Sequence, residues 1–403
     1  MNTKSYAIVT ASYWGFTLTD GALRMLVLLH FHSLGFSPLN LAFLFLLYEF
    51  CGVLTNLLGG WVGSRIGLKV TLYTGLALQI IALLMLSMIH PHWAMSLSVS
   101  YVMTSQALSG IAKDLTKMSS KSAVKLVVNG GEGALFKWVA ILTGSKNALK
   151  GVGFMLGGVS LTWLGFTHSL WLMAAALGLV LLAALIFLNQ DMGKSKKKVK
   201  FTQLFSKSRE INWLSASRFF LFASRDVWFV VALPVFLKSQ LGWSFNQVGS
   251  FMAAWVIAYG IVQASAPRLI GHHRPGRSAA RWVGLLALVT ASLGAAITLD
   301  FHPVTSIFVG LGLFGIVFAI NSAVHSYLIL TFTSDDQVAL NVGFYYMANA
   351  WGRLIGTLLS GLMFIFGGLA ACLWTSAVML LAAFIMTLPL HAAQSTMGND
   401  DEH

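Results

Sequence analysis

The sequence predicts an all-α membrane protein with twelve transmembrane helices in two six-helix halves and both termini in the cytoplasm. The chain of 403 residues is 57% hydrophobic and 10% charged, whereas a soluble domain carries about 25% charged residues. Twelve stretches reach the length of about 20 apolar residues that one bilayer crossing needs. The basic residues outside these stretches lie almost entirely on one side. No polar stretch is long enough to close a core of its own.

The twelve stretches follow one another along the chain, and the first is expected to begin without a cleavable signal before it. The predicted spans are Tyr6–Phe31, Leu39–Gly63, Val70–Ile89, Trp93–Ala112, Ala148–Phe166, Ser169–Leu188, Trp213–Lys238, Phe245–Pro267, Trp282–Leu299, Val304–Phe332, Ala339–Phe366 and Leu369–Leu390.

The distribution of lysine and arginine between the two sides predicts the orientation of the chain in the membrane. Lys238 is the only basic residue at a connection on the opposite side, so the positive-inside rule places both termini in the cytoplasm. The same rule explains the net charge of +13, so this charge does not indicate a protein that binds nucleic acid. The basic residues on the cytoplasmic side are Lys4, Arg65, Lys69, the seven lysines from Lys113 to Lys150, the run from Lys194 to Arg209, and Arg268, Arg274, Arg277 and Arg281.

The chain divides into residues 1–188, a cytoplasmic linker of residues 189–212, and residues 213–403 with a short polar tail. The linker contains KSKKKVK, a solvated topogenic run that also suits lipid headgroups. The halves resemble a parallel repeat, because SLGFS (Ser33–Ser37) recurs as QLGWS (Gln240–Ser244).

One connection carries a family motif. GWVGSRIGLK (Gly60–Lys69) resembles the signature of the loop between the second and third helices in the major facilitator superfamily, G-x-L-x-D-R-x-G-R-K. Ser64 replaces the aspartate that the family uses in a charge relay between helices. The resemblance implies a transporter with its substrate site at the midplane between the two halves.

A narrower resemblance covers nearly the whole chain. The segments Ser12–Phe31, Ala107–Lys125 and Leu142–Gly158 are similar to the ArsJ-type organoarsenical efflux permeases. The resemblance implies a bacterial inner-membrane protein that exports 1-arseno-3-phosphoglycerate and thereby confers arsenate resistance. It also implies a functional partner, a glyceraldehyde-3-phosphate dehydrogenase that makes this compound from arsenate in the cytoplasm.

The segment Leu108–Gly158 is rich in lysine, serine and threonine. Its first four lysines recur every four residues, so on a helix they form one basic stripe. The stripe and the start of the next span provide four candidate substrate ligands. One interpretation is cytoplasmic topogenic charge; the other is a funnel that concentrates a multiply charged anion at the inward mouth. The four candidates are Lys113, Lys117, Lys146 and Lys150.

Charges inside predicted spans are costly and are functional candidates by default. Asp20 and Arg24 lie four residues apart, so they can pair. One interpretation is a structural ion pair that allows both residues to insert into the membrane. The other is that Asp20 orients Arg24 toward the cavity, where Arg24 binds an anion. Arg225 and Asp226 are adjacent and point about 100° apart, so one is expected to line the cavity and the other to contact a neighbouring span. Arg24 and Arg225 are expected to face each other across the cavity.

Arg353 has no acidic residue within two turns, so it needs a distant carboxylate or an anionic ligand. The planar fork of arginine suits phosphate and arsenate. Arg218 lies near the cytoplasmic end of its span and is expected to snorkel. Glu49 is either a proton carrier or the partner of an arginine, and Asp20 and Asp226 compete for the same roles.

His325, near Asn321, is a proton-relay candidate or a hydrogen-bonded core histidine. Gly151, Gly153, Gly157 and Gly158 are expected to let the fifth span pack closely. Cys51 and Cys372 lie in apolar spans and indicate neither a disulfide framework nor a thiolate metal site.

No nucleotide-binding loop or zinc-protease motif occurs in the sequence, so secondary transport rather than catalysis is predicted, without a cofactor or resident metal. Export of a small organic anion carrying phosphate and arsenate is the first hypothesis. A proton-coupled exporter of drugs or sugars and an exchanger of organophosphate for phosphate are the alternatives. The protein is expected to be a monomer.

Overall fold

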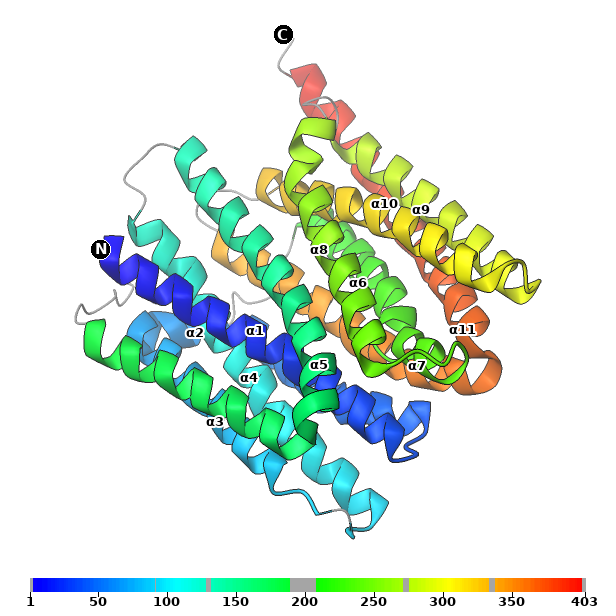
Figure 1. Ribbon diagram of the computed structural model, residues 1–403. Helices are drawn as coiled ribbons and strands as arrows, with labels where there is room; N and C mark the ends of the chain where they lie inside the picture. The colour runs from blue at the N-terminus through cyan, green and yellow to red at the C-terminus, as the bar shows by residue number, and fades with distance from the viewer. Residues whose placement is uncertain are drawn as a thin grey trace. The chain divides into compact units, whose positions relative to one another are not determined.

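The computed structural model describes residues 3–90, 92–127, 132–188, 208–270, 275–332 and 338–400. All regular structure in these ranges is helical (Figure 1). The helices are α1 (Thr3–Ser33), α2 (Pro38–Ile66), α3 (Leu68–Ser87), α4 (Met95–Val127), α5 (Glu132–Phe187), α6 (Arg209–Phe229), α7 (Ala232–Ser239), α8 (Phe245–Ile270), α9 (Pro275–Thr298), α10 (Pro303–Thr331) and α11 (Val338–Asp400).

Two of these helices each consist of two helical segments. The backbone of α5 leaves helical geometry at Gly165, where φ is 73°. The backbone of α11 does so at Gly367 and Gly368, with φ of 61° at Gly368. Only glycine adopts a positive φ at little cost. The breaks coincide with the predicted ends of the fifth and eleventh spans.

Eight stretches of the described residues are long and apolar enough to cross a membrane. Two of them, Ser145–Phe187 and Asn341–Leu390, are 43 and 50 residues long, about twice the length that one crossing needs. The helices α1 and α4 carry several charges and are not among the eight. The prediction of twelve spans therefore stays a prediction.

The chain forms two compact units. Unit 1 comprises residues 1–199 and 237–260, and unit 2 comprises residues 200–236 and 261–403. In unit 1, α1 packs along α5, α2 packs on α4, and α3 packs on α4 and α5 (Figure 1). A buried apolar cluster joins α1, α3, α4 and α5; its members are Val9, Phe16, Leu72, Leu76, Ala112, Leu177 and Leu188.

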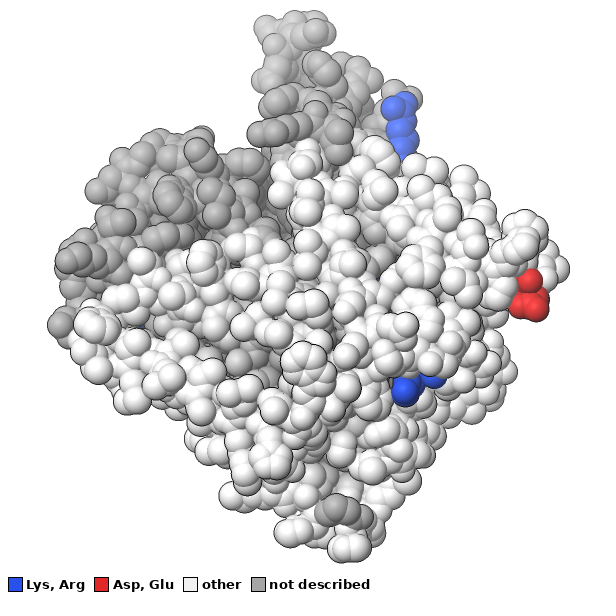
Figure 2. Space-filling view, in the orientation of Figure 1, with Lys and Arg blue, Asp and Glu red and all other residues white. Residues whose placement is uncertain are grey.

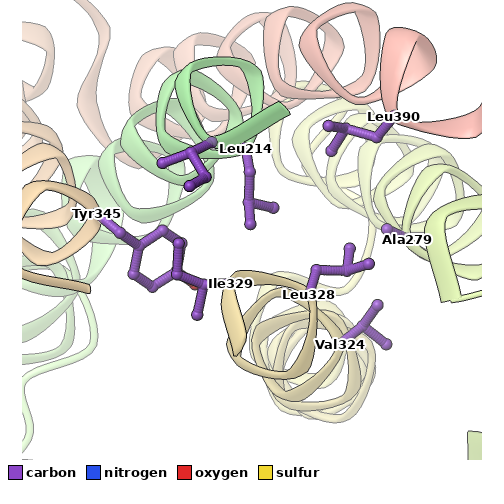
Figure 3. Close-up of a cluster of buried hydrophobic side chains, with 8 residues drawn as sticks. Leu214, Ala279, Val324, Leu328, Ile329, Tyr345 and Leu390 are labelled. Atoms are coloured by element: carbon purple, nitrogen blue, oxygen red, sulfur yellow. The ribbon is translucent and has the colours of Figure 1, made fainter. Parts of the chain in front are cut away.

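In unit 2, α11 packs along α6 and α9, and α10 packs on α9. A second buried cluster holds these helices together: Leu214 of α6, Ala279 of α9, Val324, Leu328 and Ile329 of α10, and Tyr345 and Leu390 of α11 (Figure 3). Ile211 of α6 completes it. The apolar contacts fix the relative position of the helices that carry the charges described below.

The repeated pentapeptides have the same local structure. Gly35 and Gly242 both have positive φ, 86° and 67°. The serine that ends each pentapeptide then caps the next helix: Ser37 Oγ accepts a hydrogen bond from the Asn40 N–H, and Ser244 Oγ accepts one from the Gln247 N–H, both at 3.2 Å. Such caps satisfy N–H groups that the first helical turn leaves unpaired. The local structure supports the internal repeat.

Close helix contacts repeat as well. A Cβ added to Gly153 of α5 would lie 2.5 Å from the carbonyl oxygen of Leu18 on α1. A Cβ added to Gly352 of α11 would overlap the carbonyl oxygen of Phe219 on α6. Small residues let helices approach this closely in membranes. Arg24 and Arg225 each lie six residues after the contacted carbonyl.

Large apolar side chains are exposed on both units. Trp163 is 78% exposed, and Phe366 and Leu288 are 75% and 68% exposed. The described part of the face in Figure 2 carries few lysine, arginine, aspartate or glutamate side chains. Extended apolar surface mixed with so few charges suits contact with lipid tails.

Candidate substrate site: two clusters of buried charge

The first cluster of charged side chains lies in unit 1 and includes Arg24 of α1. Its Nη1 donates to Oε1 of Glu49 on α2 at 3.2 Å, and the side chains are 11% and 1% exposed. The guanidinium also lies over the rings of Phe45 and Tyr48, with its Cζ 5.1 and 5.6 Å from the centroids. The predicted pairing of Arg24 with Asp20 is therefore replaced by a pair with Glu49, one of the two roles predicted for that residue.

Asp20 has other partners. The hydroxyl of Tyr48 donates to its Oδ1 at 2.6 Å, and Nζ of Lys150 on α5 lies 3.6 Å from its Oδ2. Nζ of Lys113 on α4 lies 4.0 Å from the centroid of the Tyr48 ring. Helices α1, α2, α4 and α5 thus bring together Lys113 and Lys150, which the sequence separates by a long stretch of chain.

The cluster in unit 1 is rich in basic groups. Arg24, Lys113 and Lys150 lie around the two carboxylates Asp20 and Glu49. In addition, Nη2 of Arg24 is buried and has no hydrogen-bond partner among the described residues. A buried donor left unpaired costs about 1–3 kcal/mol, and an anionic ligand would remove that cost.

A separate network joins α2 and α4. Asp114 accepts a hydrogen bond from Thr55 at 2.7 Å and pairs with Lys117 at 3.3 Å, while Lys117 donates to Oδ1 of Asn56 at 2.8 Å. These contacts lie toward the end of α2 that carries Ser64 in place of the family aspartate. Lys117 is therefore held in an interhelical contact, and its predicted part in a funnel stays a prediction.

The lysine stripe is helical, as predicted, because α4 continues to Val127. Lys146 is half-buried on α5. The side chains of the remaining lysines of the segment, Lys121, Lys125 and Lys137, lie outside the described residues.

The second cluster lies in unit 2 around Asp226, whose side chain is fully buried. Its Oδ1 pairs with the neighbouring Arg225 at 2.5 Å, and its Oδ2 accepts a hydrogen bond from Nε of Arg353 on α11 at 3.2 Å. Asp226 contacts the neighbouring helix α11, as expected for one member of the pair, and the long side chain of Arg225 folds back onto the same carboxylate. Two guanidiniums therefore contact one buried carboxylate.

Arg218 belongs to the same unit and was not expected in the site. It is 4% exposed, so the prediction that it snorkels to the cytoplasmic surface is wrong. Its Nε donates to Asn349 Oδ1 at 3.2 Å, and its Nη1 donates to the Ser322 hydroxyl at 3.1 Å. Gln263 donates to the same hydroxyl at 3.2 Å. The signal in the sequence was the seven-residue spacing of Arg218 and Arg225, which puts both on one helix face.

His325 and Asn321 are fully buried on α10. The side-chain nitrogens of His325 and both polar atoms of the Asn321 amide have no hydrogen-bond partner among the described residues. The expectation of a hydrogen-bonded core histidine is therefore not met. Asn321 and His325 lie one helical turn apart on α10, and Ser322 follows Asn321 directly. Because Ser322 accepts a hydrogen bond from Arg218, these polar groups without partners lie on the same part of α10 that contacts Arg218.

The glycines of α5 serve packing, as expected. Gly153 and Gly157 contact α1, whereas Gly151 and Gly158 contact the part of α8 that belongs to unit 1. Within the described ranges, no group of three or more His, Cys, Asp and Glu side chains is arranged to hold a metal ion.

Comparison with known structures shows the fold. The chain is similar to a bacterial homologue of the iron transporter ferroportin in its inward-facing state, with a TM-score of 0.71 and 15% identity over 96% of this chain and 98% of that one. The outward-facing state of a bacterial ferroportin homologue gives a TM-score of 0.67 and 16% identity, covering 94% of this chain and 98% of that one. No curated protein matches the chain in sequence.

The profile of the Major Facilitator Superfamily matches residues 7–228 and 214–399. These two matches together extend over nearly the whole chain, and the helical fold agrees with them. The chain therefore belongs to the Major Facilitator Superfamily and is a membrane transporter rather than an enzyme.

Proposed function

We propose that this transporter exports an organoarsenical anion, 1-arseno-3-phosphoglycerate, from the cytoplasm and so confers resistance to arsenate. The observation that carries the proposal is the sharing of one buried carboxylate, Asp226, by Arg225 and Arg353. Two guanidiniums gathered at one buried position favour an anionic ligand, because phosphate and arsenate oxygens bind arginine in the bidentate geometry that its planar fork favours.

Unit 1 supports the same ligand class. Arg24, Lys113 and Lys150 lie around Asp20 and Glu49, and Nη2 of Arg24 lacks a hydrogen-bond partner among the described residues. A site for cationic drugs is commonly apolar with acidic anchors, so these basic groups favour an anion. The proposed substrate ligands are Arg24, Arg225, Arg353, Lys113, Lys117, Lys146 and Lys150.

The proposal includes the setting of the transporter. Twelve helices cross the bacterial inner membrane as a monomer with both termini in the cytoplasm; the two segments of α5 and of α11 and the continuous stretch Arg209–Ser239 support that number. The halves extend over residues 1–188 and 213–403, with the linker between them. A glyceraldehyde-3-phosphate dehydrogenase supplies the substrate. Asp20, Glu49, Asp226 and His325 are the candidates for proton coupling or charge pairing.

Uptake into everted membrane vesicles tests the proposal, because export from the cell becomes accumulation inside the vesicle. The dehydrogenase, glyceraldehyde 3-phosphate, NAD and arsenate are supplied outside, and trapped arsenate is measured. We expect accumulation only when both the dehydrogenase and the transporter are present. Equal accumulation in vesicles that lack the transporter would refute the proposal.

Two additions to this assay identify the driving force. Collapsing the proton gradient with an ionophore should stop accumulation if export is coupled to protons. Preloading the vesicles with phosphate should accelerate uptake if the protein exchanges an organophosphate for phosphate, which is the alternative that would use the same arginines.

A further inference from the structure

Arg218 of α6 is a buried cation whose hydrogen-bond partners in the described part of the chain are all neutral. Its Nε donates to Oδ1 of Asn349 at 3.2 Å, and its Nη1 donates to the carbonyl and hydroxyl oxygens of Ser322 at 3.3 and 3.1 Å. Among the described residues, no carboxylate forms an ion pair with Arg218. A buried charge without a counter-charge is strongly unfavourable, so this position favours an anion.

Two aromatic rings restrict how an anion reaches this guanidinium. Its Cζ lies 4.0 Å from the ring centroid of Phe222 and 5.1 Å from that of Tyr345. Rings in these positions lie over the flat side of a guanidinium, whereas its hydrogen bonds form in the plane of the group. Nε and Nη1 already have partners, and Nη2 donates to no residue in the described ranges. The Nη2 edge is therefore the one that remains for an anion.

A short segment of α10 adds further hydrogen-bond donors at this position. The hydroxyl of Ser322 accepts hydrogen bonds from Arg218 and Gln263, so both of its lone pairs are used and its own proton has no acceptor within the described ranges. Asn321 and His325 are fully buried, and their side-chain polar atoms have no hydrogen-bond partner there either. His325 lies close enough to Arg218 for an electrostatic interaction.

The charge and the donors together specify the ligand. About nine in ten buried polar atoms have a hydrogen-bond partner, so several unmet groups beside one cation indicate a site that a ligand completes. A monovalent anion makes the site neutral, whereas a phosphate dianion would leave a buried negative charge in excess. Chloride accepts from N–H and O–H donors and donates nothing. A water molecule beside the ion would donate to the amide oxygen of Asn321 and to the acceptor nitrogen of His325.

We propose that unit 2 binds a chloride ion between Arg218 of α6 and the segment Asn321–His325 of α10. The ion neutralises Arg218 and stabilises the contact between the two helices. Its site is separate from the proposed substrate ligands Arg225 and Arg353, which contact the carboxylate of Asp226. The inference concerns a bound inorganic anion and does not depend on which cargo the transporter carries.

Equilibrium dialysis of radioactive chloride against the purified full-length protein tests the inference. Gluconate serves as the inert anion and keeps the ionic strength constant, and the detergent is uncharged. We expect saturable binding of a single chloride per protein molecule. We also expect a higher melting temperature in chloride than in gluconate, because a ligand that binds only the folded state stabilises it. Absence of saturable binding would overturn the inference.

Two variants assign the residues that hold the ion. Arg218→Gln should bind chloride at least about tenfold more weakly, because it removes a charge-assisted hydrogen bond. Asn321→Asp supplies a carboxylate as the counter-charge, so chloride binding should be lost and the melting temperature should no longer depend on chloride. Arg281→Gln removes an exposed cation of α9 and should bind like the wild type. Wild-type affinity in either site variant would overturn the inference, and Asn321→Asp provides the test if Arg218→Gln does not fold.

A third variant separates this site from the proposed substrate site. Arg225 also contacts the ring of Phe222, with its Cζ 4.9 Å from the centroid. Arg225→Gln should weaken chloride binding less than Arg218→Gln does. An equal loss in both variants would place the ion in the proposed substrate cluster and overturn a separate site. If chloride binds as expected but everted vesicles accumulate no arsenate, the proposed function is refuted and the chloride site stands.

Discussion

Asp226 on α6 accepts a hydrogen bond from Nε of Arg353 on α11 at 3.2 Å, and close contacts of the two helices at Gly352 and Gly356 lie on either side of Arg353 along α11. Gly352, the residue before Arg353, lies directly against the backbone of Phe219. The glycine brings the helices close enough for the arginine to reach the carboxylate. Packing and electrostatics in unit 2 are therefore coupled through neighbouring residues of α11.

Removing the shared carboxylate should destabilise the protein strongly. Asp226→Asn removes the negative charge that the guanidiniums of Arg225 and Arg353 both contact, and breaking a buried pair costs about 3–5 kcal/mol. We expect a lower melting temperature of the purified transporter, measured by fluorescence-detected size-exclusion chromatography. Asp300→Asn, at an exposed site, is the control and should melt like the wild type. Equal melting of both variants would show that Asp226 does not neutralise the arginines.

Arg225→Ala and Arg353→Ala should each abolish arsenate resistance in cells that also express the dehydrogenase, while the protein still inserts into the membrane. The reason is that each variant removes the positive charge that the substrate neutralises. Growth on arsenate and the amount of protein in the membrane are the measurements. Arg281→Ala, which removes an exposed arginine, should leave resistance intact. Normal resistance in both site variants would remove the two residues from the substrate site.

The transporter expressed without the dehydrogenase should protect cells poorly against arsenate and not at all against arsenite. The reason is that arsenate must first be built into an organic anion, and arsenite is neutral at cellular pH and offers no charge to the arginines. Growth curves with each oxyanion, with and without the dehydrogenase, provide the measurement. Full protection by the transporter alone would contradict the proposed substrate.

The close helix contact can be tested by adding a single methyl group. In Gly352→Ala the new Cβ would overlap the carbonyl oxygen of Phe219, and overpacking of this kind costs about 1–3 kcal/mol. We expect a lower melting temperature and weaker substrate uptake. Gly312→Ala is the matched control on α10, because no atom lies within 4 Å of its added Cβ. A normal melting temperature for Gly352→Ala would mean that α6 and α11 separate without cost.

Some features could be read directly from local sequence. The helix breaks at Gly165 and Gly367–Gly368 fall at predicted span ends, because glycine and the change in hydropathy are local signals. The paired turns at Gly35 and Gly242 repeat for the same reason. Glu49 was predicted to be a possible partner of an arginine, and it pairs with Arg24.

Other assignments failed because they depend on contacts between helices. Asp20 lies one turn from Arg24, yet Lys150 and Tyr48 take its carboxylate. Arg218 was expected at the membrane surface and is buried against Ser322 and Asn349. Spacing along one helix gives the face on which a residue lies, but it does not give which partner on another helix comes within reach.

The sequence by itself determined that this protein is a helical membrane transporter with charged residues inside its spans, because apolar length, basic asymmetry and glycine turns are properties of the chain read in order. Only the tertiary structure decided which charges neutralise one another. Ion pairs form between atoms less than about 4 Å apart, and it is the close packing of α1 on α5 and of α6 on α11 that brings those atoms together.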